Sequence, residues 1–121
     1  MKATKLLTQQ HEEVSDLFAQ FEDAEDEDRQ AELFEQIASK LAAHDAIERE
    51  VFYPACKQAL GEDEDILTES LAEHGVVEFC IYKADIANED DLPSLVKVLK
   101  ETVEHHVEEE QDELFPKVEK A

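Results

Sequence analysis

Four runs of apolar residues, each stepping by three and four positions, constrain the fold of this chain most strongly. This spacing places the apolar side chains of a run on one face of a helix. Acidic breaks at residues 22–28, 60–65 and 88–91 separate the runs, and no alternating pattern long enough for a strand competes with them. A chain of 121 residues suits one domain. The sequence therefore predicts an all-α fold, an antiparallel up-down-up-down four-helix bundle over residues 1–121.

The breaks carry residues that suit helix ends. Gly61 fits the end of a helix, where a left-handed residue is needed. Asp63, Asp65 or Asp91 can cap the helix that follows. Pro93 fits a first helical turn, where no amide hydrogen bond is lost. The composition agrees with long helices and short connections, since the chain has Gly 2, Pro 3 and 36% charged residues.

Each apolar run contains a histidine where a leucine would be expected. Residues 44–54 read HDAIEREVFYP, and residues 105–116 read HHVEEEQDELFP, which nearly repeats the first segment. In both copies a histidine precedes a glutamate by four positions and a proline by ten. Within the doublet, His106 continues the apolar stripe, whereas His105 lies about 100° around the helix. The predicted inward-facing residues are His11, His44, Glu48, His74, His106 and Glu110.

Helical rise brings these residues to one level of the bundle. At about 1.5 Å per residue, His11 and His44 lie about 20 and 24 Å from the first turn. His74 and His106 lie about 20 and 21 Å from the third turn. A kink at Pro54, which removes a backbone hydrogen bond, lets the residues after it leave as a separate short piece and keeps the levels matched. The two glutamates then face each other across the bundle, about 6 Å below their histidines.

Buried imidazoles and carboxylates at one level need compensating charge. Burying such ions without it costs on the order of several kcal/mol each, and Arg49 and Lys83 point away from the stripes by periodicity. A divalent or trivalent cation supplies the charge, as in other helix bundles with carboxylate and histidine ligands. These donors suit Fe, Mn or Zn, and a carboxylate-bridged set favours iron. The alternative is a hydrogen-bonded polar core layer without metal.

The pattern resembles the hemerythrin-like (HHE cation-binding) domain family over nearly the whole chain. The segments that carry the resemblance are an isolated His11, HDAIE before FYP, an isolated His74, and HVEEE before LFP. The resemblance implies an antiparallel four-helix bundle that holds two Fe ions in an oxo- or hydroxo-bridged di-iron centre. The ligands that it implies are His11, His44, His74 and His106 in terminal positions, and Glu48 and Glu110 as bridges.

One departure from the family lies on the third helix. Oxygen-carrying hemerythrins place two histidines four positions apart there, whereas this chain has His74 and then Glu78. Glu78 is a candidate terminal ligand, with an exposed or supporting position as the alternative. Asp45 is a second candidate for the same vacancy. A carboxylate in place of an imidazole would stabilise ferric iron, which argues against reversible oxygen carriage.

Three functions remain open at this point. The first is a non-catalytic di-iron protein that binds oxygen, nitric oxide or iron for storage, sensing or a stress response. The residues expected to line its apolar ligand pocket are Val14, Val51, Val77 and Val103. The second function is a di-iron oxidase or peroxidase, which is favoured if Glu78 binds iron. The third is a structural or interaction bundle with a metal-free core.

We predict that no aromatic or cysteine side chain binds the metal directly. Phe52, Tyr53 and Phe115 are predicted to pack the end of the bundle. Cys56 and Cys80 lie far apart without a CxxC arrangement, which indicates reduced thiols. Cys80 falls between the stripe positions and is not counted as a ligand.

The formal net charge of −22 bears on partners and location. So acidic a surface repels phosphate backbones and anionic lipid, which predicts no nucleic acid and no membrane partner. No apolar run reaches the length of a signal peptide or a membrane span, so a cytoplasmic location is expected. The same charge opposes casual association but allows contact through an apolar patch, so we expect a monomer or a weak dimer.

Overall fold

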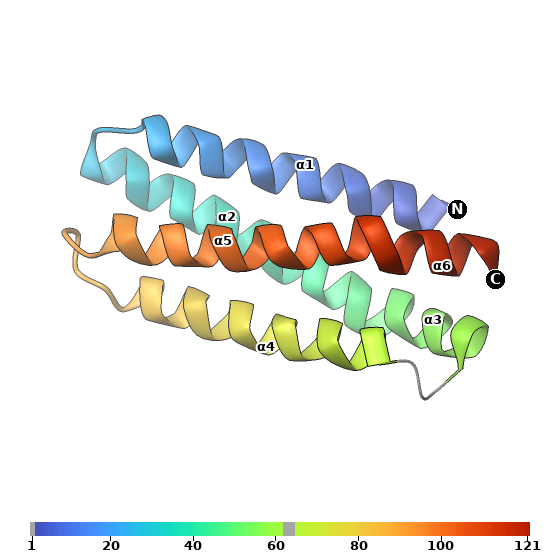
Figure 1. Cartoon of the computed structure of the whole chain (residues 1–121). Coiled ribbons are helices and arrows are strands. Elements are labelled where there is room, and N and C mark those ends of the chain that lie inside the picture. Colours follow the sequence, from blue (N-terminus) through green and yellow to red (C-terminus); the bar gives the residue numbers. More distant parts are fainter. Residues whose placement is uncertain (1, 62–64) are drawn as a thin grey trace.

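Four long helices form a bundle in which each runs antiparallel to the long helix before it in the chain (Figure 1). The computed structural model describes residues 2–61 and 65–121. The long helices are α1 (Lys2–Asp23), α2 (Glu27–Ile47), α4 (Asp65–Asp85) and α5 (Leu92–Glu109). α1 packs against α2 and α4 packs against α5, and there is no strand within the described ranges. The predicted all-α four-helix bundle is confirmed.

α2 and α5 each pass into a five-residue π-helix at a glutamate. η1 (Glu48–Phe52) continues α2 and leads into α3 (Tyr53–Leu60). η2 (Glu110–Leu114) continues α5 and leads into α6 (Phe115–Lys120). In both places the aromatic residue that opens the next helix donates its backbone N–H to the carbonyl of the glutamate five residues earlier. The repeated sequence therefore produces a repeated local structure.

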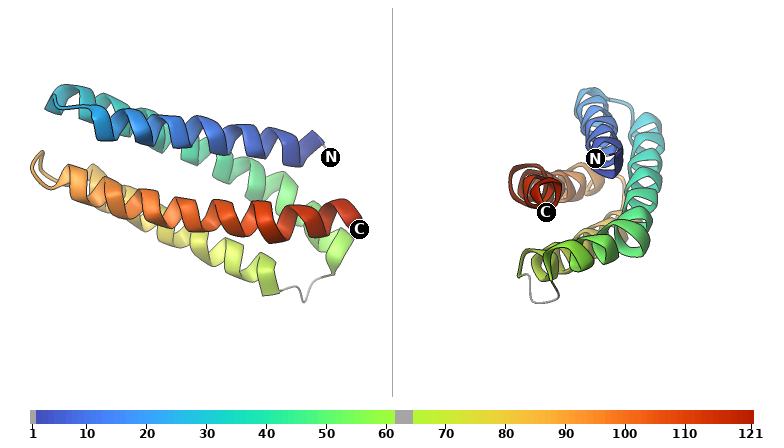
Figure 2. Two further views of the ribbon diagram at one scale, coloured as in Figure 1. Left: turned by 45° about the horizontal axis from the view of Figure 1, so that its top comes forward. Right: turned by 90° about the vertical axis from the view of Figure 1, so that its right-hand side faces the viewer.

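A proline follows each π-helix and accounts for the wider turn. Pro54 and Pro116 are the second residues of α3 and α6. In a regular α-helix the proline ring clashes with the carbonyl four residues earlier, and a π-turn relieves that crowding. The kink expected at Pro54 takes this form, and α3 is the separate short piece. The right-hand view of Figure 2 shows the chain turning here, and α3 contacts α4.

The π-helices change which residues face the core. Because the wider turn adds a residue, the next buried residue after Glu48 is Phe52 and not Val51. Val51 is 64% exposed, so its predicted place in the ligand pocket is wrong. In the second copy, Leu114 follows Glu110 at the same spacing and is fully buried.

Two apolar clusters fill the bundle, one on each side of a polar layer. The larger cluster lies toward the α1–α2 and α4–α5 turns and includes Ile37 and Val14. The smaller cluster lies toward the opposite end and includes Leu7 and Leu114. Each long helix carries its histidine between the two clusters, as His11 lies between Leu7 and Val14. Close packing on both sides fixes the spacing of the four helices around the polar layer.

The residues predicted to begin or end helices are only partly where the sequence predicts them. Gly61 has φ 102 and closes α3, as its position predicts. Pro93 lies in the first turn of α5, and Asp91 precedes that helix, but its side chain makes no capping hydrogen bond. Asp65 is the first residue of α4 and not its cap. Asp63 lies outside the described residues.

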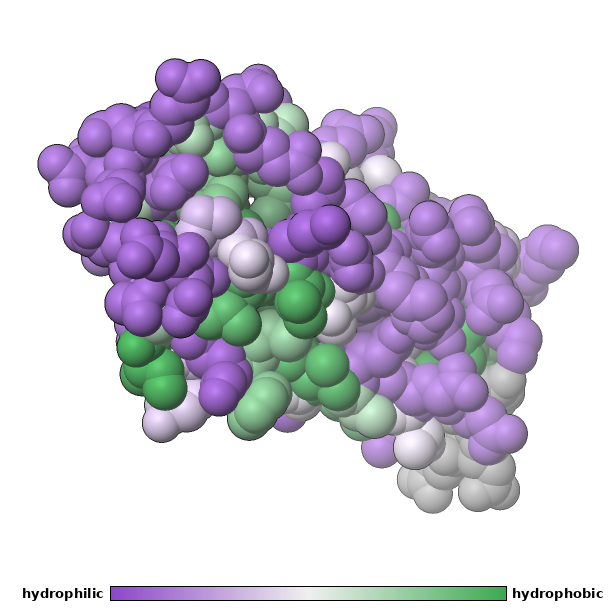
Figure 3. Space-filling view, turned by 60° about the vertical axis from the view of Figure 1, so that its left-hand side comes forward, coloured by the Kyte–Doolittle hydropathy of each residue, from purple (hydrophilic) through white to green (hydrophobic). Residues whose placement is uncertain are grey.

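The outer face of α4 exposes an apolar stripe. Val76, Phe79, Tyr82 and Ile86 are each between 51% and 62% exposed and share one helical face by their spacing. Figure 3 shows a largely hydrophilic face on which hydrophobic side chains gather in one region. A monomer or weak dimer stays a prediction. Over the residues described, none of the helices combines the length and hydropathy needed to span a bilayer.

Candidate metal centre

Six of the predicted site residues meet in the polar layer of the bundle. Their side chains come from all four long helices and from the first residue of each π-helix. The histidines are 5% to 7% exposed and the two glutamates are fully buried. The members of the layer are His11, His44, Glu48, His74, His106 and Glu110. The common level expected from helical rise is the level at which the structure places them.

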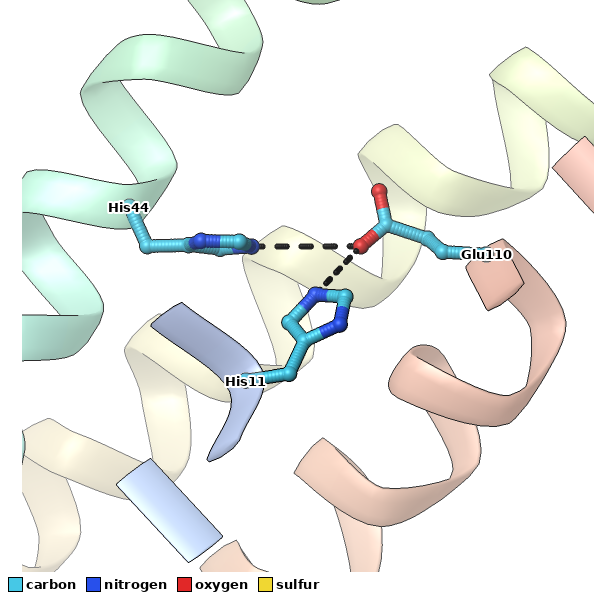
Figure 4. A group of neighbouring side chains, drawn as sticks. All are labelled: His11, His44 and Glu110. Carbon is cyan, nitrogen blue, oxygen red and sulfur yellow. Dashed lines mark hydrogen bonds and ion pairs between the residues drawn. The ribbon is translucent and has the colours of Figure 1, made fainter. Parts of the chain in front are cut away.

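The layer divides into two groups of two histidines and one glutamate. In the first group, Nε2 of His11 lies 3.1 Å and Nε2 of His44 lies 3.8 Å from Oε1 of Glu110. Figure 4 shows both imidazoles directed at this carboxylate. In the second group, Nε2 of His74 lies 3.0 Å and Nε2 of His106 lies 3.5 Å from Oε1 of Glu48. In each group the potential ligand atoms lie within 4.8 Å of one another. Two histidines and a carboxylate suit a non-haem ferrous ion with open positions.

Each glutamate also faces an imidazole of the other group. Glu48 Oε1 lies 3.0 Å from Nε2 of His44, and Glu110 Oε1 lies 3.3 Å from Nε2 of His106. In each glutamate, Oε1 is thus within reach of an ion held by either pair of histidines. This placement suits carboxylates that are shared between two cations.

The outer nitrogen of every histidine in the layer is held by a side-chain oxygen. Carboxylate and amide oxygens accept hydrogen bonds, so each Nδ1 donates and each Nε2 turns inward as the available ligand atom. This orientation is the one that metal-binding histidines adopt. The four pairs are His11 with Gln111, His44 with Gln10, His74 with Asp45, and His106 with Glu73.

Two buried atoms of the layer have no hydrogen-bond partner within the described part of the chain. They are Nε2 of His44 and Oε2 of Glu48. Buried polar atoms without partners are rare because their desolvation is not repaid. A cation in the layer would engage both atoms, so the donor set fits a metal ion.

An apolar cavity borders the histidines on the side of the larger cluster. Its volume is about 270 Å³, and Val14, Val77 and Val103 line it as expected. It contacts the imidazoles of all four histidines and neither glutamate of the layer. A small apolar molecule therefore has space beside the nitrogen donors.

The family comparison agrees with this geometry. The model for the hemerythrin HHE cation-binding domain matches residues 2–118. The chain belongs to the hemerythrin family. Neither a curated protein nor a solved structure matches the chain.

Glu78 does not join the layer of this hemerythrin-family protein. Its side chain is 59% exposed and accepts a hydrogen bond from Nη2 of Arg49 at 3.0 Å. Val77 takes the inward position on α4 and Glu78 lies at the cavity rim. Asp45 lies behind His74, where it accepts hydrogen bonds from that imidazole and from Arg49. The geometry supports the exposed alternative for Glu78 and a supporting position for Asp45.

Tyr53 is a member of the site that sequence reasoning assigned to packing. It is 2% exposed, and its hydroxyl donates to Oε2 of Glu110 at 2.8 Å and lies 3.0 Å from Nε2 of His74. The corresponding residue in the second copy is Phe115, whose ring stacks on His11 at 5.9 Å. Comparing the two copies would have revealed this tyrosine, because its hydroxyl distinguishes the two aromatic positions before proline.

Charge in the layer is strongly coupled. Burial lowers the pKa of His44, but the carboxylates of Glu110 and Glu48 outweigh burial and raise it to about 9. The same opposing causes raise the pKa of His106 to about 11. Burial raises the pKa of Glu110, while its interaction with Glu48 and hydrogen bonds from the imidazoles hold it well below its usual value. In the metal-free protein, protons on the imidazoles balance the glutamates.

The metal-free protein should lose stability as pH rises above 6.5. Histidine has an unperturbed pKa of 6.5, and the folded pKa values of His44 and His106 are about 9 and about 11. The stability that their protonation contributes is therefore complete below pH 6.5 and is lost as pH rises from 6.5 through the folded pKa values. We expect the thermal midpoint of chelator-treated protein, followed by circular dichroism, to fall between pH 6.5 and 9.

Bound metal should remove most of this fall, because the cation takes the place of the protons. His44→Gln should flatten the slope, because it removes one of the two imidazoles whose folded pKa is raised. A midpoint that stays constant or rises over the same pH range would contradict the assignment.

Proposed function

We propose that this domain holds two iron ions in the polar layer and binds a small diatomic gas, oxygen or nitric oxide, for storage, sensing or a stress response. The observation that carries this proposal is the apolar cavity against the imidazoles of all four histidines. The same ligands would also bind iron if the protein stores or senses iron itself. The proposed location is the cytoplasm.

The ligand roles follow the two groups of the layer. His11 and His44 would hold one ion, and His74 and His106 the other. Glu48 and Glu110 would be shared, as their contacts with both groups support. Sulfur takes no part: Cys56 is buried, and burial together with Glu110 and Glu48 raises the pKa of its thiol to about 12.

The surroundings of the layer favour gas binding. Ferrous iron, when bound, would donate electron density to a diatomic ligand. Three valines line the cavity beside the histidines, and an apolar wall there limits proton access, which favours reversible binding. Glu78 is directed outward to Arg49 and leaves its candidate ligand position open. The carboxylate that would have favoured ferric chemistry is thus directed away from the layer.

A di-iron oxidase or peroxidase is the second candidate. The observation that favours it is Tyr53, whose hydroxyl contacts both Glu110 and His74 from the side of the smaller cluster. A phenol at this position can deliver a proton to a reacting oxygen species. Catalytic consumption of peroxide by the iron-loaded protein would identify this function.

Glu48→Ala should abolish tight metal binding, whereas Glu78→Ala should not. Glu48 is fully buried against imidazoles of both groups, but Glu78 is exposed and bonded to Arg49. We expect Glu48→Ala to weaken ferrous binding by more than about 100-fold, beyond the usual cost of losing an outer partner. Anaerobic calorimetric titration measures both variants against the wild type. Equal losses in the two variants would contradict the assigned ligands.

Val77→Phe should slow gas binding without changing the iron content. Val77 lines the cavity, while its neighbour Val76 is 51% exposed and serves as the matched control. We expect nitric oxide association, followed by stopped-flow absorbance, to slow by about tenfold in Val77→Phe, a barrier increase of ~1.4 kcal/mol. Val76→Phe should match the wild type.

Two results would contradict the proposed gas function. The first is equal association rates in Val77→Phe, Val76→Phe and wild type at equal iron content. The second is irreversible oxidation of the ferrous protein by oxygen with turnover of peroxide, which favours the enzyme.

A further inference from the structure

The outer hydrogen-bond partners differ between the two groups of histidines. The two histidines of the α1–α2 pair, His11 and His44, donate Nδ1–H to the neutral amide oxygens of Gln111 and Gln10, at 2.8 and 2.7 Å. The two histidines of the α4–α5 pair, His74 and His106, donate to the carboxylates of Asp45 and Glu73. The division into amide and carboxylate partners coincides with the division into metal groups.

A carboxylate partner makes an imidazole a stronger donor. The negative oxygen draws the Nδ1 proton toward itself and leaves more electron density at Nε2, which raises the basicity of the ligand. A neutral amide oxygen orients the ring equally well but adds no charge. Hydrogen bonds to ionised groups are also stronger than neutral ones, so the α4–α5 imidazoles are held more firmly.

Neighbouring cations do not cancel this difference. Arg49 donates from Nε to the Asp45 oxygen at 2.7 Å, but its side chain is 39% exposed and solvent screens its charge. His105 donates Nδ1–H to the second oxygen of Glu73 at 2.5 Å, so Glu73 joins both histidines of the doublet. In both cases the neighbour fixes the carboxylate against its imidazole. His105 therefore acts through Glu73 on His106, which explains the doublet.

We propose that the position formed by His74, His106 and Glu48 binds its metal ion more tightly than the position formed by His11, His44 and Glu110. The chain then fills in two steps, first between α4 and α5 and then between α1 and α2. At limiting metal the protein carries one ion, and the α1–α2 position exchanges with the available metal. This inference rests on the proposed two-ion site and adds an order to it.

Titration of the full chain with cobalt(II) tests this order without redox chemistry. Chelator-treated protein is titrated at pH 7 and followed by calorimetry and native mass spectrometry. We expect two steps that differ by about 10- to 100-fold in affinity, the usual effect of an outer carboxylate on a ligating histidine. At one equivalent of cobalt(II), the one-ion species should predominate.

Isosteric substitutions provide matched variants. Asp45→Asn with Glu73→Gln should weaken the first step by about 10- to 100-fold and bring the two steps together. Gln10→Glu with Gln111→Glu should instead strengthen the second step. A purely structural effect would weaken both steps in either variant, so the opposite directions distinguish the two explanations. Circular dichroism checks that each variant is folded.

Two ligand variants locate the steps. His74→Gln should remove the tight step, and His11→Gln should remove the weak one. Two equal or cooperative steps in the wild type, or a tight step that survives His74→Gln, would overturn the proposed order while the two-ion site stands. Failure of the wild type to bind any cobalt(II) would instead overturn the proposed function.

Discussion

Glu48 and Glu110 have no exposed surface, and the negative charge that they bring into the bundle has to be balanced inside it. Within the described residues the ion pairs of both glutamates are with imidazoles. Imidazoles can balance carboxylates by holding protons or by sharing a cation with them. A shared cation would in addition engage Oε2 of Glu48, which has no hydrogen-bond partner among the described residues, so metal binding and folding stability are linked.

The remaining structure serves to hold these groups at one level. The apolar clusters on either side of the layer keep water out and fix the helix spacing. The π-helices begin at the two glutamates and turn an aromatic side chain under each pair of histidines, Phe115 beneath His11 and Tyr53 beneath His74. A proline follows each wide turn, so the repeated segment gives the same local structure twice. The two halves differ in their outer hydrogen bonds and in the Tyr53 hydroxyl.

Periodicity was sufficient to predict the helices, the antiparallel order and the meeting of the four histidines, because each depends only on regular helical geometry. It failed where the geometry is not regular. Val51 was placed in the pocket by a step of three, and the π-helix makes that step four, so Phe52 is buried instead. Glu78 is a candidate ligand by its spacing from His74, and its pairing with Arg49 depends on tertiary contact between α4 and η1. Gln10, Gln111 and Glu73 were missed for the same reason, since each reaches its histidine from another helix.

X-ray absorption at the iron edge of the fully loaded protein tests the central claim, which is that two ions share buried carboxylates. The proposed site predicts a first shell of nitrogen and oxygen without sulfur, and a second iron at roughly 3.5–4 Å, the separation of shared two-metal sites. An isolated iron without a neighbouring metal, or a sulfur atom in the first shell, would contradict the account.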